Sequence, residues 1–410
     1  MQDNEKKPAL RFKGFTDPWE QRKLGEIAKE VVRNDPASDA PIMMITAGNG
    51  FIEQSDRYAF NNAGESLKKY ILLERGELAY NHGASKLRPY GSCFALTTVE
   101  KARIPFVYHC FSVEKSNPEF LSIELNGANV ENQLRKIVSS GARMDGLLNI
   151  AYSEYTEVTV QLPKKEEQDW IAKFFKHLDT LITLHQRKYE KLVNIKKSML
   201  DKMFPPNGAS VPEIRFKGFT DPWEQRKLDE IANFSKGVGY SKNDLCEEGT
   251  PIILYGRLYT KYETSIFDVD TFVKEKAGSV YSKGGEVIVP ASGETAEDIS
   301  IASVVVKPGI LLGGDLNIVS PTTEYDSAFL ALTISSGAAH EYLSSLAQGK
   351  SVVHLHNADI QSVSAKFPTK REQEKIHLLF GKIDTLITLH QRKLEKLQNI
   401  KKSCLEKMFV

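Results

Sequence analysis

The chain has 410 residues, enough for two or three domains at about 150 residues each. Its 41% hydrophobic and 26% charged residues are typical of a globular protein, and the net charge of +1 gives no argument for or against nucleic acid. No apolar run approaches the roughly 18 residues that cross a bilayer. The polar start MQDNEKKPALRFKGF lacks the apolar core of a secretory signal, so we expect a cytoplasmic protein that does not contact a membrane. The cysteines show no CxxC spacing, which argues against a zinc site or a disulfide framework.

Two long repeats organise the chain. RFKGFTDPWEQRKL occupies residues 11–24 and returns unchanged at 215–228. DTLITLHQRKYEKLVNIKKSMLDKMF begins at Asp179, and a near-copy begins at Asp384. Just ahead of these lie PKKEEQDWI and PTKREQEKI. A long internal period usually means duplicated domains, so we expect two halves with a pseudo-twofold relation.

Each half contains a short scaffold segment, a variable body and a long terminal segment. The predicted segments are 1–28 (N-terminal scaffold), 29–162 (first body), 163–206 (central helix), 207–232 (repeated scaffold), 233–367 (second body) and 368–410 (C-terminal helix). The two bodies share little sequence but have the same order of features. Each has a Pro-Ile start, a Gly-Glu pair entering a strand, a Phe-Leu segment, and a last alternating strand in TEVTVQLP or QSVSAKFP. We therefore predict strand-rich α+β bodies.

The terminal segments have the clearest helical pattern. Apolar residues recur every three or four positions from Ile171 to Met203 and from Ile376 to Met408, and Pro205 and Pro206 end the first segment. Each helix would be on the order of 55 Å long. Because a lone helix with such a stripe is unstable in water, we expect the two to pair in antiparallel fashion between the bodies. His185 and His390 lie on the stripe, where packing at a helix–helix contact is favoured over a metal site because no ligand set accompanies them.

No catalytic motif accompanies this scaffold. QGKS at residues 348–351 resembles the end of a phosphate-binding loop, but Ser344 stands where the first glycine belongs. The sequence has no GxSxG, no HExxH and no (N/D)PP(Y/F) tetrapeptide. We therefore predict no catalytic residue and no metal site. A metal pair at His354 and His356 is the weaker alternative to a surface or groove role.

The variable bodies carry loops with basic, aromatic and amide side chains, which suit contact with DNA bases and phosphates. For each residue alone, an ordinary solvated side chain is favoured over a DNA contact, and the loops are stronger candidates as groups. The candidate DNA-binding residues are Asn81, His82, Lys86, Arg88, Tyr90 and Arg143 in the first body, and Tyr240, Lys242, Arg257, Tyr259, Lys261, Lys350, His354 and His356 in the second.

With its entry RFxGFxxxWEQRKLxEI, its P-(x)3-EQ-x2-I helix start and its helix end IKKSxLxKMF, the chain resembles the specificity (S) subunit of type I restriction–modification enzymes. The resemblance implies that each body is a target recognition domain for one half of a split, asymmetric DNA sequence. It implies two modification subunits that use S-adenosylmethionine to methylate adenine N6, and optionally two restriction subunits that use ATP and Mg²⁺. The S subunit itself would not be an enzyme and would hold no cofactor.

Two other classes stay open. One is an adaptor with two protein-interaction domains on a coiled-coil spacer that never contacts DNA. The other is a self-sufficient nuclease or methyltransferase with an unrecognised site. Trp19 and Trp223 of the entry motif would either pack inside each half or contact a partner.

Overall fold

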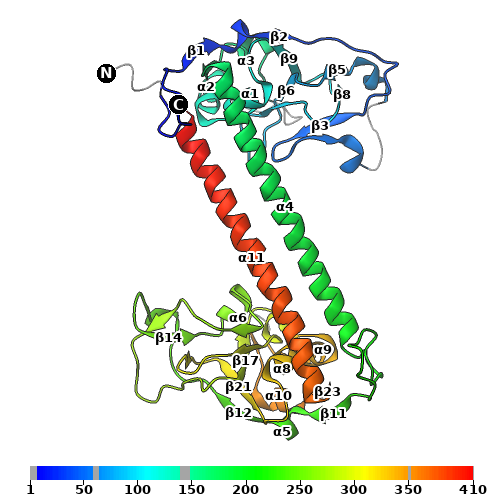
Figure 1. Ribbon diagram of the computed structural model, residues 1–410, viewed down its shortest axis with the longest axis vertical. Helices are drawn as coiled ribbons and strands as arrows, with labels where there is room; N and C mark the ends of the chain where they lie inside the picture. The colour runs from blue at the N-terminus through cyan, green and yellow to red at the C-terminus, as the bar shows by residue number, and fades with distance from the viewer. Residues whose placement is uncertain (1–6, 59–63, 139–147, 350–351, 410) are drawn as a thin grey trace. The chain divides into compact units, whose positions relative to one another are not determined.

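The computed structural model describes residues 7–58, 64–138, 148–349 and 352–409. The chain divides into two compact units. Unit 1 comprises residues 1–184 and 394–410, and unit 2 comprises residues 185–393. Each unit therefore contains one body together with one end of each long helix (Figure 1).

Unit 1 has mixed helix and strand structure, as the sequence predicts. Its strands are β1 Glu20–Lys23, β2 Ala28–Glu30, β3 Met43–Thr46, β4 Gly50–Glu53, β5 Ile71–Glu74, β6 Leu78–Asn81, β7 Ser92–Ala95, β8 Lys101–Ile104, β9 His109–Val113 and β10 Thr159–Leu162. Its body helices are α1 Pro118–Leu125, α2 Ala128–Ile137 and α3 Tyr152–Tyr155, with short 3-10 turns η2 Leu24–Glu26, η3 Gln54–Asp56 and η4 Gly64–Lys69. A four-stranded sheet in the order β2-β9-β6-β7 forms its centre.

Unit 2 follows a related plan. Its strands are β11 Glu224–Lys227, β12 Ala232–Lys236, β13 Leu245–Cys246, β14 Thr250–Ile253, β15 Ser265–Ile266, β16 Phe272–Val273, β17 Glu286–Pro290, β18 Ser292–Gly293, β19 Ser303–Val305, β20 Leu311–Leu312, β21 Leu316–Pro321, β22 Val353–His354 and β23 Ser364–Phe367. Its body helices are α5 Leu228–Ile231, α6 Arg257–Thr260, α7 Ala296–Ile299, α8 Ser327–Ile334, α9 Gly337–Leu346 and α10 Asn357–Ser362, and η5 spans Lys242–Asp244. The five-stranded sheet β12-β21-β17-β19-β15 repeats the β2-β9-β6 arrangement of unit 1 in its first three strands.

The predicted long helices are present. Helix α4 spans Lys165–Met203 and helix α11 spans Lys370–Met408, each with 39 residues. They run antiparallel: Asp179 of α4 pairs with Lys401 of α11 in unit 1, and Lys196 of α4 pairs with Asp384 of α11 in unit 2. These two ion pairs join equivalent positions of the sequence repeat, with the two helices exchanged.

The repeated entry motif forms the base of each body. In unit 1, strand β1 pairs antiparallel with β10, the last strand of the body, and Trp19 beside it is buried. In unit 2, β11 pairs with β23 in the same way and Trp223 is buried. Both tryptophans are therefore buried within their own unit, which agrees with the packing alternative rather than with contact to a partner.

The ends of the long helices complete the two cores. Phe409, just after α11, packs in unit 1 with its ring 5.9 Å from Trp19 and 5.7 Å from Phe120. Phe204, just after α4, packs in unit 2 with its ring 5.8 Å from Trp223 and 5.4 Å from Phe329. Each body thus buries the C-terminal end of one helix and carries the start of the other.

The motif at the start of each long helix has a structural explanation. The carboxylate of Glu167, with 1% of its side chain exposed, accepts two hydrogen bonds from Arg11 at 2.7 Å. Glu372, fully buried, accepts the same pair from Arg215 at 2.7 and 2.8 Å. Such forked contacts satisfy both carboxylate oxygens, which makes a buried charge tolerable. The entry motif is thereby fixed to the helix that follows its own body.

The glutamine of the same motif fixes the body. The Gln168 side-chain oxygen accepts a hydrogen bond at 2.8 Å from the backbone N–H of Asn117, whose own side chain caps α1. In unit 2, Gln373 accepts at 2.9 Å from Asp326, which caps α8. The Glu-Gln pair therefore joins scaffold, body and long helix at one point in each unit.

Candidate nucleic-acid interface

The main candidate loop of the first body lies between β6 and β7, which pair antiparallel with Asn81 opposite Ser92. Gly91 closes the loop with φ of +83°, and a Cβ there would lie 2.6 Å from the carbonyl oxygen of Asn81. Only glycine fits this backbone. The loop therefore leaves the sheet at a fixed place.

Most of the predicted residues in this loop hold it in place. The Asn81 side chain donates to the carbonyl oxygen of Ile45 at 3.1 Å, and buried His82 places Nδ1 2.9 Å from the carbonyl oxygen of Leu148. Arg88 donates to the carbonyl oxygen of Asn126 at 2.6 Å, and burial lowers its pKa. The backbone oxygen of Tyr90 accepts from the Tyr80 hydroxyl at 2.5 Å. Lys86 and Leu87 are exposed at the loop tip.

The imidazoles beside this loop belong to an aromatic cluster. The rings of His82 and His109 lie 5.1 Å apart, and Tyr80 stacks on Tyr155 at 3.9 Å. The Nε2 atom of His109 lies 3.0 Å from the carbonyl oxygen of Ile150, and burial lowers the pKa of this ring. Both histidines therefore use one ring nitrogen on a backbone carbonyl. Over the described residues, no group of three or more His, Cys, Asp or Glu is placed to hold a metal ion.

In the second body, Tyr240 takes a left-handed backbone conformation with φ of 60°. Its hydroxyl lies 2.6 Å from Oγ of Ser279, and Lys276 covers its ring with Nζ 5.0 Å from the centroid. Lys242, at the start of η5, is exposed. Of this pair, Tyr240 is held in place and Lys242 is the one whose side chain faces solvent.

The predicted contacts Arg257, Tyr259 and Lys261 lie in residues 254–262, which include the short helix α6 rather than only a loop. Arg257 is 8% exposed, and its guanidinium pairs with Asp270 and Glu263, both at 2.8 Å. Lys261 also pairs with Asp270 at 2.8 Å and stays half exposed. The Tyr259 ring lies 6.1 Å from that of Tyr255, and burial raises the Tyr259 pKa to about 12. Arg257 organises this segment, whereas Lys261 and Tyr259 lie nearer its surface.

His354 and His356 are both exposed and flank the buried Leu355. Nδ1 of His354 lies 3.1 Å from Oγ of Ser292, because β22 pairs with β18 there. The strand ends at His354, and His356 instead precedes α10, with its backbone N–H donating to Asp359. Arg143 and Lys350 lie outside the described residues. None of the fourteen residues is tested as a DNA contact by these positions, and all stay predictions.

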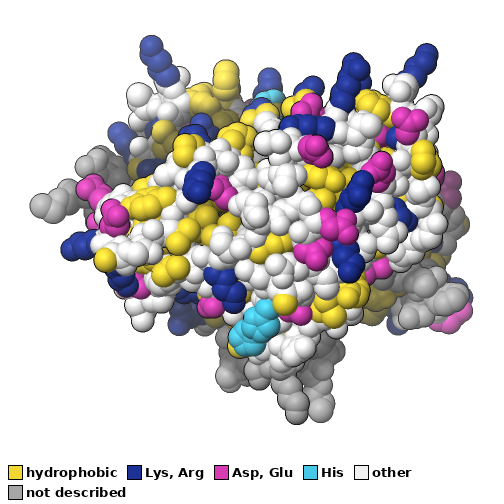
Figure 2. Space-filling view, turned by 90° about the horizontal axis from the view of Figure 1, so that it is seen from below, with side chains coloured by type: hydrophobic (Ala, Val, Ile, Leu, Met, Phe, Trp, Pro, Cys, Tyr) yellow, Lys and Arg dark blue, Asp and Glu magenta, His cyan; other side chains and the backbone are white. Residues whose placement is uncertain are grey.

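Charge does not single out a binding face on the end of unit 2 that carries α5 and β12. Figure 2 shows basic and acidic side chains interspersed there rather than gathered by sign. A mixed face of this kind gives no long-range attraction for a polyanion. Any contact with DNA through this face would therefore depend on particular loops.

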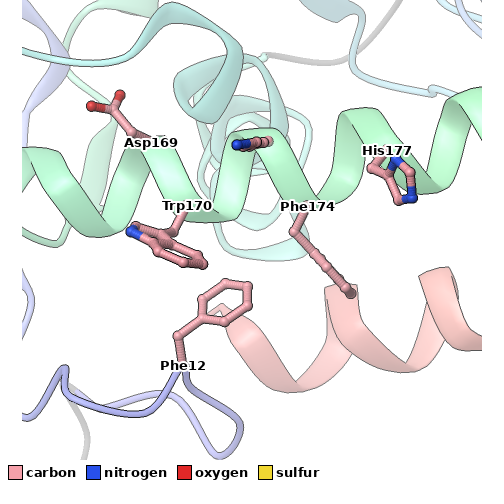
Figure 3. A pocket seen from close by; sticks show the side chains of 6 residues that line it. Phe12, Asp169, Trp170, Phe174 and His177 are labelled. Atoms are coloured by element: carbon pink, nitrogen blue, oxygen red, sulfur yellow. The ribbon is translucent and has the colours of Figure 1, made fainter.

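Sequence reasoning missed an apolar hollow on the scaffold of unit 1. A cavity of about 420 Å³ is lined by Phe12 of the entry motif and by Asp169, Trp170, Lys173, Phe174 and His177 of α4. The Phe12 ring points toward Trp170 and Phe174 (Figure 3), and Trp170 is 59% exposed. In unit 2, Lys375 occupies the repeat position of Trp170. Its Nζ lies 4.9 Å from the centroid of the Phe219 ring. The two scaffolds therefore differ here despite their nearly identical motifs.

Comparisons with known proteins agree with this architecture. Residues 220–399 match the family described as type I restriction modification DNA specificity domain. The type I restriction enzyme MjaVIII specificity subunit of Methanocaldococcus jannaschii is 22% identical over 277 residues, which cover 65% of this chain and 64% of that protein. The match thus spans somewhat less than two thirds of the relative's length.

The fold is also that of a solved structure. The crystal structure of the S subunit of a type I restriction–modification system from M. genitalium aligns with a TM-score of 0.63 and 14% identity, over 98% of this chain and 99% of that one. The HsdS subunit from Thermoanaerobacter tengcongensis aligns over 95% of this chain at a TM-score of 0.42 and 15% identity. No helix in the described residues is both long enough and apolar enough to cross a membrane. Residues 220–399 therefore match the type I restriction modification DNA specificity domain, and the chain has the fold of a solved S subunit of a type I restriction–modification system.

Proposed function

We propose that this chain reads a bipartite, asymmetric DNA sequence, with each body contacting one half. The observation that carries the proposal is the combination of equivalent scaffolds with different bodies. The ion pairs Arg11–Glu167 and Arg215–Glu372 are equivalent contacts in the two units. The cores around Trp19 and Trp223 are equivalent as well. The sheets of the two bodies differ in the number and order of their strands, and the bodies differ in amino-acid sequence. A duplicated scaffold with two unlike bodies suits the reading of two unlike half-sites.

The proposed partners are two modification subunits and, optionally, two restriction subunits, acting with double-stranded DNA in the cytoplasm. Exposed apolar side chains on the long helices support protein partners: Trp170 and Leu405 in unit 1, and Leu378 and Leu389 in unit 2. Single exposed apolar residues are ordinary, so the stronger support is the apolar hollow of unit 1, where Phe12, Trp170 and Phe174 lie together.

Catalysis would reside on those partners. The sequence has neither an (N/D)PP(Y/F) tetrapeptide nor a complete phosphate-binding loop. S-adenosylmethionine would bind the modification subunits, and ATP with Mg²⁺ the restriction subunits. Methylation of adenine N6 requires the base to leave the helical stack, so this chain would orient the duplex while its partner receives the base.

The long helices would set the gap between the two half-sites. Each is a single helix of 39 residues, and a helix keeps a fixed rise of about 1.5 Å per residue. Inserting whole helical turns at equivalent positions, near Lys191 in α4 and Lys396 in α11, should change the gap while leaving both half-words intact. An unchanged gap would remove the helices from this role.

Exchange of one body tests the proposal. The second body, residues 233–367, would be replaced by that of another specificity subunit with a different target, and the complex assayed for methylation of synthetic duplexes. We expect the sequence of one methylated half-site to change and that of the other half-site to stay the same. The adaptor alternative predicts no effect on methylated sequence, and it also predicts no duplex affinity that falls steeply with salt.

A further inference from the structure

A cluster of three side chains ties the second body to the long helices, and the described residues of the first body form no equivalent cluster. Lys196 of α4 and Asp384 of α11 form an ion pair at 2.6 Å within unit 2. The Thr264 hydroxyl donates to the other oxygen of Asp384 at 2.8 Å, and Nζ of Lys196 lies 3.4 Å from the same hydroxyl. Tyr262 adds its ring, with its centroid 5.5 Å from Nζ of Lys196. We call Thr264, Asp384 and Lys196 the latch.

The latch lies at the junction between a candidate reading segment and the body's main sheet. Thr264 is 6% exposed and immediately precedes β15, and its carbonyl oxygen accepts from the N–H of Val304 in the sheet. Four residues before Thr264, helix α6 ends, and Arg257 at its start pairs with Glu263 beside Thr264. Movement of Thr264 would therefore shift the segment that bears Arg257, Tyr259 and Lys261.

Unit 1 provides an internal comparison. Asp179 and Lys401 occupy the repeat positions of Asp384 and Lys196 and pair at 2.5 Å. Their side chains are 52% and 34% exposed, whereas those of Asp384 and Lys196 are 26% and 17% exposed. Among the described residues, the side chains of Asp179 and Lys401 hydrogen-bond only to each other. The ion pair of unit 1 is thus more exposed to solvent, whereas the equivalent ion pair of unit 2 is covered by the body.

We propose that Thr264 is a positioning residue, which fixes the α6 segment of the second body on the helix pair through Asp384 and Lys196. A hydrogen bond to a charged group that is shielded from water is stronger than one at the surface. The second body therefore reads DNA at a set position relative to α4 and α11, a restraint that the described residues of the first body do not show. The part that concerns reading rests on the proposed function.

The first test uses the full chain alone and does not depend on DNA. Hydrogen exchange of backbone amides in residues 254–266 would be compared in the wild type, Thr264→Val and Thr264→Ser. Valine keeps the shape and removes the hydroxyl, so exchange should rise by about tenfold, the factor expected for one hydrogen bond to a charged group. Serine keeps the hydroxyl and should restore protection. Unchanged exchange in Thr264→Val would overturn the latch.

A matched pair of variants separates the latch from helix pairing. Asp384→Asn removes the charge from the latch, whereas Asp179→Asn removes it from the more exposed pair of unit 1. We expect increased exchange in residues 254–266 for Asp384→Asn and no such change in the first body for Asp179→Asn. Equal loosening of both bodies would show that the ion pair serves only the helices, and the proposal would be wrong.

The second test uses the complex with its modification subunits on duplexes with the native gap or a gap one base pair longer or shorter. Thr264→Val should lower the preference for the native gap by about tenfold, and Thr264→Ser should retain it. Looser exchange with an unchanged gap preference would overturn the positioning role in reading. If the wild-type complex methylates no duplex, the proposed function fails, and the exchange experiment still decides the latch.

Discussion

His185 of α4 and His390 of α11 face each other with their Nδ1 atoms 2.8 Å apart. They are the same position of the repeat, so the contact joins a residue to its own counterpart. At this distance one nitrogen donates and the other accepts, which means that the two facing nitrogens hold one proton between them. The packed-histidine reading of the stripe is therefore the one that the structure supports.

This pair should make unit 2 less stable in mild acid. Burial, the charge of His185 and the nearby Lys188 and Lys393 lower the pKa of His390 below its ordinary value of 6.5. Because the folded-state pKa is lowered, stability is fully present above pH 6.5 and is lost as the pH falls below it. Replacing both histidines by asparagine should weaken this acid dependence, which thermal unfolding from about pH 7.5 to 5 measures. An equal acid dependence in the variant would contradict the assignment.

Glu124 in α1 should make unit 1 less stable as the pH rises, the opposite of the acid dependence expected from the histidine pair. Burial raises its pKa to about 7, against a hydrogen bond from the backbone N–H of Gln161. Since the folded-state pKa is raised, the stability that Glu124 gives is present below its ordinary value of 4.5 and is lost as the pH rises through about 7. Glu124→Gln should remove that loss, as hydrogen exchange of unit 1 at pH 6 and pH 8.5 would measure.

The second body offers a control for this effect. Asp326 and Phe329 of α8 correspond to Asn117 and Phe120 of α1, so Thr333 stands at the position of Glu124. Threonine does not titrate in this range. Because Nδ1 of His377 lies 2.8 Å from the carboxylate of Asp326 at the start of α8, the comparison uses a His377→Gln background. In that background unit 2 should show no alkaline loss of stability at α8, and an alkaline loss shared by both units would argue against Glu124 as its source.

The end of each long helix should stabilise the body it packs against. Phe409→Ala removes a ring from the Trp19 core and should lower the free energy of unfolding of unit 1 by roughly 2–4 kcal/mol. Phe204→Ala should do the same in unit 2, where the ring packs on Trp223. Hydrogen exchange resolved by unit would measure both. If Phe409→Ala loosened unit 2 and spared unit 1, the assignment of the C-terminal end to the first body would be wrong.

Alanine substitutions of Lys86 and Arg88 should have different effects, although both residues lie in one predicted DNA-contact loop. Lys86 is exposed, so Lys86→Ala should weaken duplex binding and lower the slope of log affinity against log salt by about one, with folding unchanged. Arg88 is bonded to the Asn126 carbonyl, so Arg88→Ala should also loosen the loop. Binding isotherms across salt, together with thermal unfolding, separate the two. An unchanged salt slope in Lys86→Ala would remove it from the interface.

Local patterns predicted much of the fold. A stripe with three- and four-residue spacing and no proline from Ile171 to Met203 predicted the long helix that α4 forms over Lys165–Met203, because helix formation depends on neighbours along the chain. The last strands of both bodies were recognisable from alternation, and they are β10 and β23.

Contacts between distant residues were not predictable from these patterns. Arg11 and Glu167 are 156 positions apart, and nothing in either segment identifies the other as its partner. Arg257 shows the same limit at the candidate site, since a basic residue in a polar segment looks solvated until the fold brings Glu263 and Asp270 to it. Thr264 carried no signal, although the repeat itself marked its partners Asp384 and Lys196 as copies of Asp179 and Lys401.

The most direct test of the central claim is a genome-wide map of N6-methyladenine by single-molecule sequencing. Cells would carry this chain with its modification subunit, and controls would lack the chain. We expect one bipartite methylated motif, with two unlike half-words and a fixed gap, only when the chain is present. Unchanged methylation in cells where the two proteins co-purify would contradict DNA recognition and favour the adaptor.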